Sequence, residues 1–465
     1  MSLIFYDLET TGTSSRWDQI LQFACIRTDD DLNIIEEPFE IRSRLQPHIV
    51  ASPGALHVTG QSIEDILDPQ RPSHYEMVSA IREHLSGRCP SVFVGYNSLR
   101  FDEEFLRNAF YACLHQPYLT NTNGSGRADA LLLMKAVATL HPGLLNVPEN
   151  DAGKPTLKLD RLAPANGFSD FNAHDALADV YAMIAMCRIV KERAREAWAR
   201  FIEFARPEPV ERFLADNDPL VLFEPYGVFG VAYVVSPLGR GQGRLRYALD
   251  LLCDLDELAG LDDEQLAKRV ARSPKPIRRF RTNAAPFLWR LADSPPDVLR
   301  EVPEHELRAR AERVRQDEAF VARLLAAAQA AEKAYEPSQH VEEGLYEGFW
   351  SPSDERLMQT FHSVPWERRV MLCGEFEDRR LRTLARRLIY FERPDLLTQA
   401  ERQQFEEAIR RRTCSDAEVP WLTASGALAE LEQIARDPDR RADERLAAYR
   451  NYLEKVALTA APLEG

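Results

Sequence analysis

The sequence predicts an α/β domain built on a mixed β-sheet, followed by a small β domain and a helical C-terminal domain. Strand-like segments come first in the chain and then alternate with helical segments. A charged, proline-containing stretch at 191–212, which we interpret as a linker or domain boundary, leads into strand-like segments with glycine-rich turns. After residue 350 only helical patterns occur. We therefore expect three domains, at 1–195, 196–349 and 350–465.

The composition is that of a globular protein. A chain of 465 residues is long enough for about three domains, and 45% of its residues are hydrophobic. No segment approaches the roughly 18 consecutive apolar residues of a membrane span, and the N-terminus lacks a signal-peptide pattern. The seven cysteines are scattered and never form Cys-x-x-Cys, which argues against disulfides and zinc. We expect a cytoplasmic protein without a membrane segment.

The overall charge argues against a generally basic nucleic-acid-binding surface. The formal net charge is −15, the opposite of the usual footprint of such proteins, so any nucleic acid must contact a local basic patch. One candidate is a predicted strand that carries Arg278, Arg279 and Arg281. This segment is either a track for phosphates or a solvated edge strand, and its pattern alone leaves both interpretations open.

The first predicted strand ends in carboxylates. Residues 3–6 are apolar, as in a strand covered on both faces, and the two-residue period places Phe5, Asp7 and Glu9 on one face. Neighbouring carboxylates repel each other and stay ionised readily only if a cation lies between them. All-oxygen ligands favour Mg²⁺ or Mn²⁺. The Asp-x-Glu pattern by itself is also common at solvated strand ends.

The next segments complete a mixed sheet flanked by helices. Alternating or apolar patterns predict strands at 19–27, 32–41 and 91–95. Helical spacing predicts helices at 73–85, from 102, from 129, at 157–163 and at 173–190. Three early strands followed by alternating strands and helices are typical of the ribonuclease-H-like arrangement.

Two of these helices bring further acidic residues. Asp102 opens a helix directly after a buried strand, and Asp179 lies in the last helix, five positions after His174. Each can converge on one point with Asp7 and Glu9. A histidine at a helix start is often a cap or a surface residue, so the interpretation of His174 as a base depends on the carboxylates around it.

Taken in order, these motifs resemble the DEDDh exonuclease superfamily. The resemblance rests on Asp7-Leu8-Glu9-Thr10, on Tyr96-Asn97 with Phe101-Asp102, and on His174 with Asp179. Further phrases resemble the bacterial exodeoxyribonuclease I family, among them Arg100-Phe101-Asp102-Glu103, Asn172-Ala173-His174-Asp175-Ala176 and Leu345-Tyr346-Glu347-Gly348-Phe349. The resemblance therefore covers nearly the whole chain.

The resemblance implies a DNA-repair exodeoxyribonuclease that degrades single-stranded DNA from its 3′ end and releases 5′-mononucleotides. Two Mg²⁺ ions, with Mn²⁺ as the alternative, hydrolyse the phosphodiester in this family. The implied metal ligands are Asp7, Glu9, Asp102 and Asp179. His174 is the implied general base, since an imidazole can accept a proton near neutral pH.

The same resemblance implies contacts with DNA at Glu9, Lys158, Arg107, Lys135 and Tyr118. Lys158 is as compatible with a solvated lysine on an amphipathic helix as with a contact to the substrate. The segment 116–126, which includes Tyr118, departs from the family pattern and contains few aromatic residues. The contacts made by Arg107, Lys135 and Tyr118 are therefore less closely specified than the metal ligands.

The resemblance also covers the later domains. It implies an SH3-like β-barrel domain that, with the helical C-terminal domain, closes a groove over the DNA strand. It implies a partner as well, the acidic, Phe-ended tail of single-strand DNA-binding protein. Arg313 and Arg315 lie in an Arg-rich segment that either docks this tail or is a solvated helix. Candidates for an apolar pocket beside them are Leu307, Val314 and Phe320. We expect a monomer.

Two other functions are to be distinguished from this one. An RNA-trimming DEDDh exonuclease would resemble only the first part of the chain and would lack the later domains. A non-catalytic nucleic-acid scaffold would have lost at least one of the four carboxylates, and none is missing.

Overall fold

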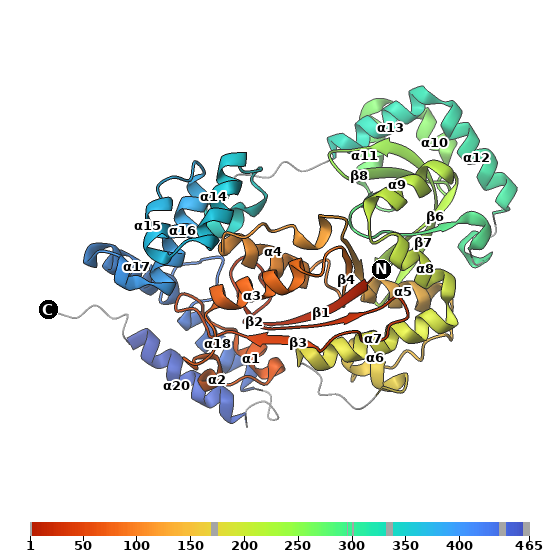
Figure 1. Cartoon of the computed structure of the whole chain (residues 1–465). Helices are drawn as coiled ribbons and strands as arrows, with labels where there is room; N and C mark the ends of the chain where they lie inside the picture. Colours follow the sequence, from red (N-terminus) through yellow and green to blue (C-terminus); the bar gives the residue numbers. More distant parts are fainter. Residues whose placement is uncertain are drawn as a thin grey trace.

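The computed structural model describes residues 2–168, 175–294, 296–299, 302–331, 338–436 and 443–458. Its first domain contains a five-stranded sheet with the order β3-β2-β1-β4-β5 (Figure 1). The strands are β1 (Ser2–Thr10), β2 (Ile20–Thr28), β3 (Phe39–Arg42), β4 (Ser91–Gly95) and β5 (Gly126–Asp129). The central strand β1 is antiparallel to β2 and parallel to β4, which confirms the predicted mixed sheet.

The strand predicted at 32–41 is shorter than expected. Only Phe39–Arg42 pairs with β2, and Ile34 makes an isolated bridge to Thr28. The Asp29 carboxylate accepts hydrogen bonds from two backbone N–H groups of the following turn, in which Leu32 has a φ of 65°. Because these residues form a turn, the extended strand begins only after it. The apolar pattern alone therefore overestimated the length of the strand.

Helices cover both faces of this sheet. Those on one face are α5 (Ala130–Leu140), α6 (Leu159–Ala165) and α7 (Ala176–Arg193); those on the other are α3 (His74–Ser86) and α4 (Asp102–Ala112). Leu3 and Phe5 of β1 are buried with α5 and α7, whereas Ile4 and Tyr6 are buried with α3 and α4. The two-residue period thus directs the odd-numbered residues of β1 toward α7. Short helices complete the domain: α1 (Pro53–Thr59), α2 (Ile63–Ile66) and η1 (Leu119–Asn121).

The second domain is built on an antiparallel sheet with the order β10-β6-β7-β8-β9. Its strands are β6 (Leu220–Tyr226), β7 (Phe229–Arg240), β8 (Leu245–Asp250), β9 (Ile277–Arg281) and β10 (Phe287–Arg290). Its helices are α10 (Leu255–Gly260), α11 (Asp263–Ala271), α12 (Glu304–Gln316) and α13 (Glu318–Ala330), with short turns η2 (Leu291–Asp293) and η3 (Pro296–Leu299). Within the described residues the outer strands β9 and β10 do not pair with each other. The structure therefore has a small antiparallel β domain where a barrel was expected.

The stretch 191–212, predicted as a linker, is instead helical. The helices α8 (Arg195–Glu203) and α9 (Pro207–Asp216) follow α7 with only short breaks. Trp198 and Phe201 are buried. Pro207 lies in the first turn of α9, where a backbone N–H would have no partner within the helix, so the lack of an N–H in proline costs nothing. The charged residues that suggested a linker belong to the exposed faces of amphipathic helices.

The C-terminal region is helical, as predicted. It contains α14 (Pro352–Ser363), α15 (Trp366–Leu372), α16 (Arg379–Glu392), α17 (Gln399–Thr413), α18 (Ala424–Ile434) and α20 (Glu444–Leu458), with short turns η4 (Val341–Tyr346) and η5 (Pro394–Leu396). The helices α14 and α16 share a hydrophobic core with α3 and α4, whereas α18 and α20 pack on α1 and α2 (Figure 1). In the described part of the chain, no helix is both long and apolar enough to cross a membrane.

Gly126 in the edge strand β5 offers a test of how the first domain packs on the α8–α9 connection. A Cβ at this position would lie 2.7 Å from the carbonyl oxygen of Ala205, and the Arg127 N–H donates to that oxygen at 2.9 Å. Gly126→Ala is expected to lower the free energy of unfolding by about 1–3 kcal/mol, because the backbone must shift. Gly260→Ala, with nothing within 4 Å of the added Cβ, is the matched control and should be neutral or slightly stabilising in urea unfolding. Equal effects of the two substitutions would contradict this account.

Candidate active site

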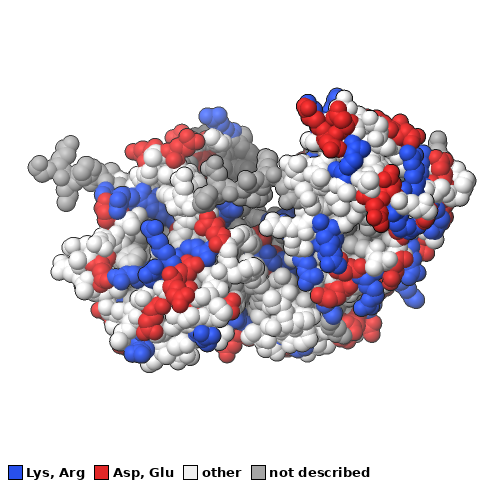
Figure 2. Space-filling model, turned by 90° about the horizontal axis from the view of Figure 1, so that it is seen from above, with Lys and Arg blue, Asp and Glu red and all other residues white. Residues whose placement is uncertain are grey.

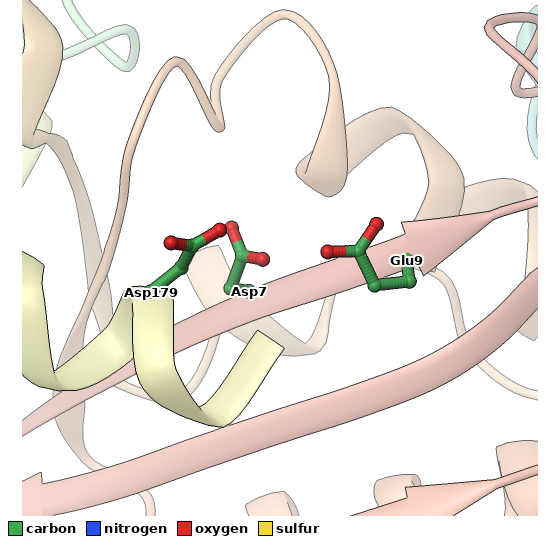
Figure 3. Close-up of side chains that lie close together, drawn as sticks. All are labelled: Asp7, Glu9 and Asp179. Carbon is green, nitrogen blue, oxygen red and sulfur yellow. The ribbon is translucent and has the colours of Figure 1, made fainter. Parts of the chain in front are cut away.

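Three carboxylates meet beside the central strand. Asp7 and Glu9 project from one face of β1, and Asp179 projects from the first turn of α7 toward Asp7 (Figure 3). One carboxylate oxygen of each residue lies within 4.8 Å of the corresponding oxygens of the other two. The strand period and the packing of α7 on that face produce this arrangement. The donor set consists of oxygens only, which suits a hard divalent cation such as Mg²⁺ or Mn²⁺.

Asp102 extends this group. It is the first residue of α4, is only 3% exposed, and accepts a hydrogen bond from the backbone of Leu8. Its charge raises the pKa of both Asp7 and Glu9, so it lies close to them. It does not belong to the three-carboxylate group with oxygens within 4.8 Å. The structure thus brings the four predicted carboxylates into one neighbourhood, with three of them in ligand geometry.

The charges in this neighbourhood oppose one another. Loss of surrounding water and the charges of Asp102 and Asp179 hold the pKa of Asp7 well above its ordinary range. Loss of water and the charge of Asp179 raise the pKa of Glu9 to about 8, and burial raises the pKa of Asp102 to about 8. Without a cation, the raised pKa values of Glu9 and Asp102 therefore favour their protonated forms at neutral pH. A divalent cation would reverse this effect, because it stabilises the ionised forms.

Asp129 is a buried residue that sequence reasoning used only as a helix start. Its carboxylate accepts hydrogen bonds from the backbone N–H groups of Asn97 at 2.9 Å and Leu99 at 3.4 Å, and it also caps α5. These bonds fix the turn between β4 and α4, in which Asn97 has a φ of 61°. The turn sets where α4 begins and hence where Asp102 lies. An acidic residue at the end of a short strand, directly before a helical pattern, was the available signal.

The predicted base, His174, lies outside the described residues. Its neighbour Asp175 caps the N-terminus of α7 and accepts hydrogen bonds from the Arg42 guanidinium at 2.7 Å and the Gln22 amide at 3.1 Å. Glu9 faces Gln22 across β1 and β2, and Gln22 faces Arg42 across β2 and β3. This cross-strand row therefore fixes the start of α7 beside the carboxylates. Sequence reasoning missed Gln22 and Arg42, because strand register is not visible in one sequence.

An open groove lies where the three regions of the chain meet. Its volume is about 1230 Å³, and Figure 2 shows the hollow between the lobe of the second sheet and the C-terminal helices from above. The first domain contributes Arg107 and Tyr118, the second domain contributes Arg281, and the segment before α14 contributes Tyr346 and Phe349. The groove thus connects α4, which begins with Asp102, to the second sheet and to the segment before α14.

The sequence-predicted DNA contacts fall on different parts of this surface. Arg107 lines the groove, but it is largely buried and pairs with Glu103 and Glu104, while its guanidinium lies 5.3 Å from the Tyr118 ring. Lys135 lines an adjoining cavity of about 460 Å³ and donates to the carbonyl oxygen of Gly227 at 2.7 Å. Lys158 is exposed at the start of α6 and is not among the described residues that line either cavity.

The three arginines of the basic strand β9 lie in two different environments. Arg281 lines both the groove and the adjoining cavity, and Arg279 lines the cavity. Arg278 instead pairs with Glu224 at 3.2 Å, and its guanidinium lies 3.7 Å from the Tyr233 ring. Two of the three arginines therefore face the first domain, where a phosphate track was one of the two interpretations.

The arginines of α12 are already paired with acidic residues. Arg313 donates to Asp256 at 2.6 Å, and Arg315 donates to Asp218 at 3.5 Å, although both side chains remain about half exposed. Leu307, Val314 and Phe320, the candidates for an apolar pocket beside them, are 0%, 2% and 7% exposed and belong to the core of the second domain. The pocket prediction was therefore wrong, because the apolar faces of α12 and α13 pack inward.

Comparison with known proteins places the chain among exonucleases. Residues 4–187 match the family model described as exonuclease, and residues 339–456 match the exonuclease I C-terminal domain. The chain is 29% identical to exodeoxyribonuclease I of Escherichia coli K12, over 98% of both chains. It is 30% identical to exodeoxyribonuclease I of Haemophilus influenzae, over 82% of this chain and 84% of that protein.

Solved structures agree with this relationship. E. coli exonuclease I in complex with a dA16 oligonucleotide matches with a TM-score of 0.84 and 26% identity, over 98% of this chain and 99% of the other. A zinc-bound complex of the same enzyme with single-stranded DNA, at the same identity and coverage, has a TM-score of 0.83. A structure of SSB/exonuclease I with an inhibitor has a TM-score of 0.81, again at 26% identity and with the same coverage. Together with the acidic cluster and the groove, these matches show that the chain belongs to the exodeoxyribonuclease I family.

Proposed function

We propose that this protein removes nucleotides one at a time from the 3′ end of single-stranded DNA and releases 5′-mononucleotides. Membership of the exodeoxyribonuclease I family makes it a metal-dependent exonuclease. The observation that carries the proposal is the cluster of mutually repelling carboxylates at Asp7, Glu9, Asp102 and Asp179, together with a groove of about 1230 Å³ that is lined in part by α4, the helix that begins with Asp102. We place its action in DNA repair in the cytoplasm, as a monomer.

The four carboxylates are the proposed ligands of two divalent ions, with Mg²⁺ as the resident metal and Mn²⁺ as a substitute. Such a pair stabilises the attacking and departing oxygens of a phosphodiester. Each carboxylate is held in position by its surroundings. Glu9 lies on β1, Asp179 lies on α7, and Asp102 accepts a hydrogen bond from the backbone of Leu8. His174 is the proposed base that accepts the proton of the attacking water. Arg42 and Gln22 support that role by fixing Asp175, the next residue.

The groove supports a single strand as substrate. Phe349 is 92% exposed and Tyr346 is 51% exposed, and both line the groove. Exposed aromatic rings stack on unpaired bases, which a duplex does not offer. Arg281 of the second domain and Lys135 of the first domain are the proposed phosphate contacts in the cavity that both line, with Arg107, Tyr118 and Lys158 as further candidates. We propose the three domains at 1–195, 196–349 and 350–465 as the units that form the groove, the middle one being related to SH3-like domains.

One experiment tests this proposal against its alternatives. End-labelled single-stranded DNA, duplex DNA and RNA are incubated with the protein, with and without EDTA. The proposal expects shortening of single-stranded DNA alone, from the 3′ end, and no reaction in EDTA. Preferred shortening of RNA would support an RNA-trimming exonuclease, and binding without hydrolysis would support a scaffold.

Loss of one metal ligand separates hydrolysis from binding. Asp7→Asn or Asp179→Asn is expected to lower hydrolysis of single-stranded DNA by at least about 10³-fold, because each removes a charged ligand of the reacting centre. Binding of the strand in EDTA should change little, as the groove residues are untouched. Asp151→Asn, at a 90% exposed carboxylate, is the matched control. Near-normal turnover of either variant at ordinary Mg²⁺ would contradict the two-metal assignment.

The pKa shifts predict how pH affects the metal-free protein. Glu9 has a pKa of about 8 when folded against an ordinary value of 4.5, so the folded state binds more protons than the unfolded state in this interval. Stability of the metal-free protein should therefore fall as pH rises through it. Mg²⁺ should raise the melting temperature more at pH 8.5 than at pH 6, since ionised carboxylates bind it more tightly. Thermal unfolding at both pH values, with Mg²⁺ or EDTA, measures this, and a Mg²⁺ effect independent of pH would refute it.

A tail-docking site on the second domain is the proposed contact with single-strand DNA-binding protein. The SSB/exonuclease I structure supports such a partner, and Arg313 and Arg315 offer half-exposed guanidinium groups. Charge reversal at both positions should weaken binding of an acidic, Phe-ended tail peptide in a salt-dependent way and leave hydrolysis of bare DNA unchanged. Fluorescence anisotropy with a labelled peptide measures the affinity. Unchanged affinity would remove this helix as the docking site.

A further inference from the structure

A short segment forms one wall of the groove. We call residues 338–349 the strap; its residues that line the groove are Ser338, Gln339, His340, Glu343, Tyr346, Glu347 and Phe349. The strap contains the η4 turn and is held to α4 at two points. The Tyr111 hydroxyl donates to the Val341 carbonyl at 2.8 Å, and the Tyr346 hydroxyl donates to the Glu104 carboxylate at 2.7 Å. Its aromatic residues therefore stand beside the helix that begins with Asp102.

Arg412, near the end of α17, contacts the strap on the side away from the groove. Its guanidinium donates to the Glu342 carboxylate at 2.6 Å. The same guanidinium lies 5.2 Å from the ring of Trp17 and 5.1 Å from the ring of Trp421. His340 of the strap contacts both tryptophan rings at 5.3 Å. One side chain thus joins the first domain, the strap and the C-terminal helices.

Arg412 does not itself line the groove, and its side chain is only 13% exposed. Its contacts to the tryptophan rings are cation–π contacts in a setting with little water, where they are stronger than at an exposed surface. Glu342 has a second partner, Arg387 at 2.7 Å, and the two arginines hold the pKa of Glu342 at about 2. When Arg412 is replaced, Arg387 still pairs with Glu342. Replacement of Arg412 therefore removes contacts only on the side of the strap that carries His340.

We propose that Arg412 is a positioning residue for the DNA strand: it fixes the strap so that His340, Tyr346 and Phe349 present a preformed wall to the nucleotides behind the scissile bond. The inference rests on the proposed hydrolysis of single-stranded DNA in this groove. Arg412 contacts neither the carboxylate cluster nor the groove. Arg412 therefore affects the substrate only through the strap. The size of this effect should depend on whether the substrate is long enough to reach the strap.

The test compares a long and a short substrate. Arg412→Gln is assayed on long oligothymidylate and on thymidine 5′-(4-nitrophenyl) phosphate, which is too short to reach the strap. On the long substrate KM should rise about tenfold, the loss expected when one stacked base is released, with kcat retained. On the short substrate both constants should stay at the wild-type values. Arg412→Lys, which keeps the charge, should recover part of the loss, and Arg411→Gln, at a 71% exposed neighbour on the same helix, should behave as wild type.

A double-mutant cycle gives a second, independent measurement. Phe349→Ala should raise KM on the long substrate, and the combination with Arg412→Gln should be no worse than the stronger single variant, because both act on one wall. The proposal is overturned if the two losses add, if KM is unchanged in Arg412→Gln, or if kcat on the short substrate falls together with the melting temperature. Failure of the wild-type protein to hydrolyse any single-stranded DNA would instead refute the proposed function.

Discussion

Repulsion among four carboxylates is the constraint on which the first domain is built. Asp7 and Glu9 are held by β1, Asp102 by α4 and Asp179 by α7, so none can turn away to relieve the others. The fold maintains this unfavourable arrangement through hydrogen bonds that fix the elements themselves. Asp129 fixes the turn before α4, and Asp175 fixes the start of α7. Strain of this kind is typical of sites that are completed by a ligand, because the ligand removes the repulsion.

The sequence predicted the parts of this site that follow from local patterns. The two-residue period of residues 3–9 was enough to place Asp7 and Glu9 on one face, and the structure has them there, facing α7. The start of a helix at Asp102 was visible because it follows a short apolar strand. The motif order then supplied the family, and the comparisons confirm it. Assignment of individual roles to these residues stays a prediction.

What the sequence could not supply depends on contacts between distant segments. The row from Glu9 through Gln22 to Arg42 requires the register of three strands. The charged stretch 191–212 resembled a linker, because its few apolar residues look sparse until they are seen packed in two helices. Leu307, Val314 and Phe320 looked available for a partner, although they fill the core beneath α12. In each case the sequence shows which residues are apolar or charged, but it does not show which part of the protein those residues contact.

The pairing of arginines around the groove bears on how a strand can move through it. The guanidinium of Arg107, which lines the groove, is shared with Glu103 and Glu104. A phosphate beside Arg107 must compete with these two carboxylates, so Arg107 should contribute less to the salt dependence of DNA binding than an unpaired arginine would. Bases that stack on exposed aromatic rings would meet a similar surface after each step of one nucleotide. A strand that moves past Arg107 would then have little ionic attraction to overcome at this point, which suits an enzyme that must advance after every cleavage.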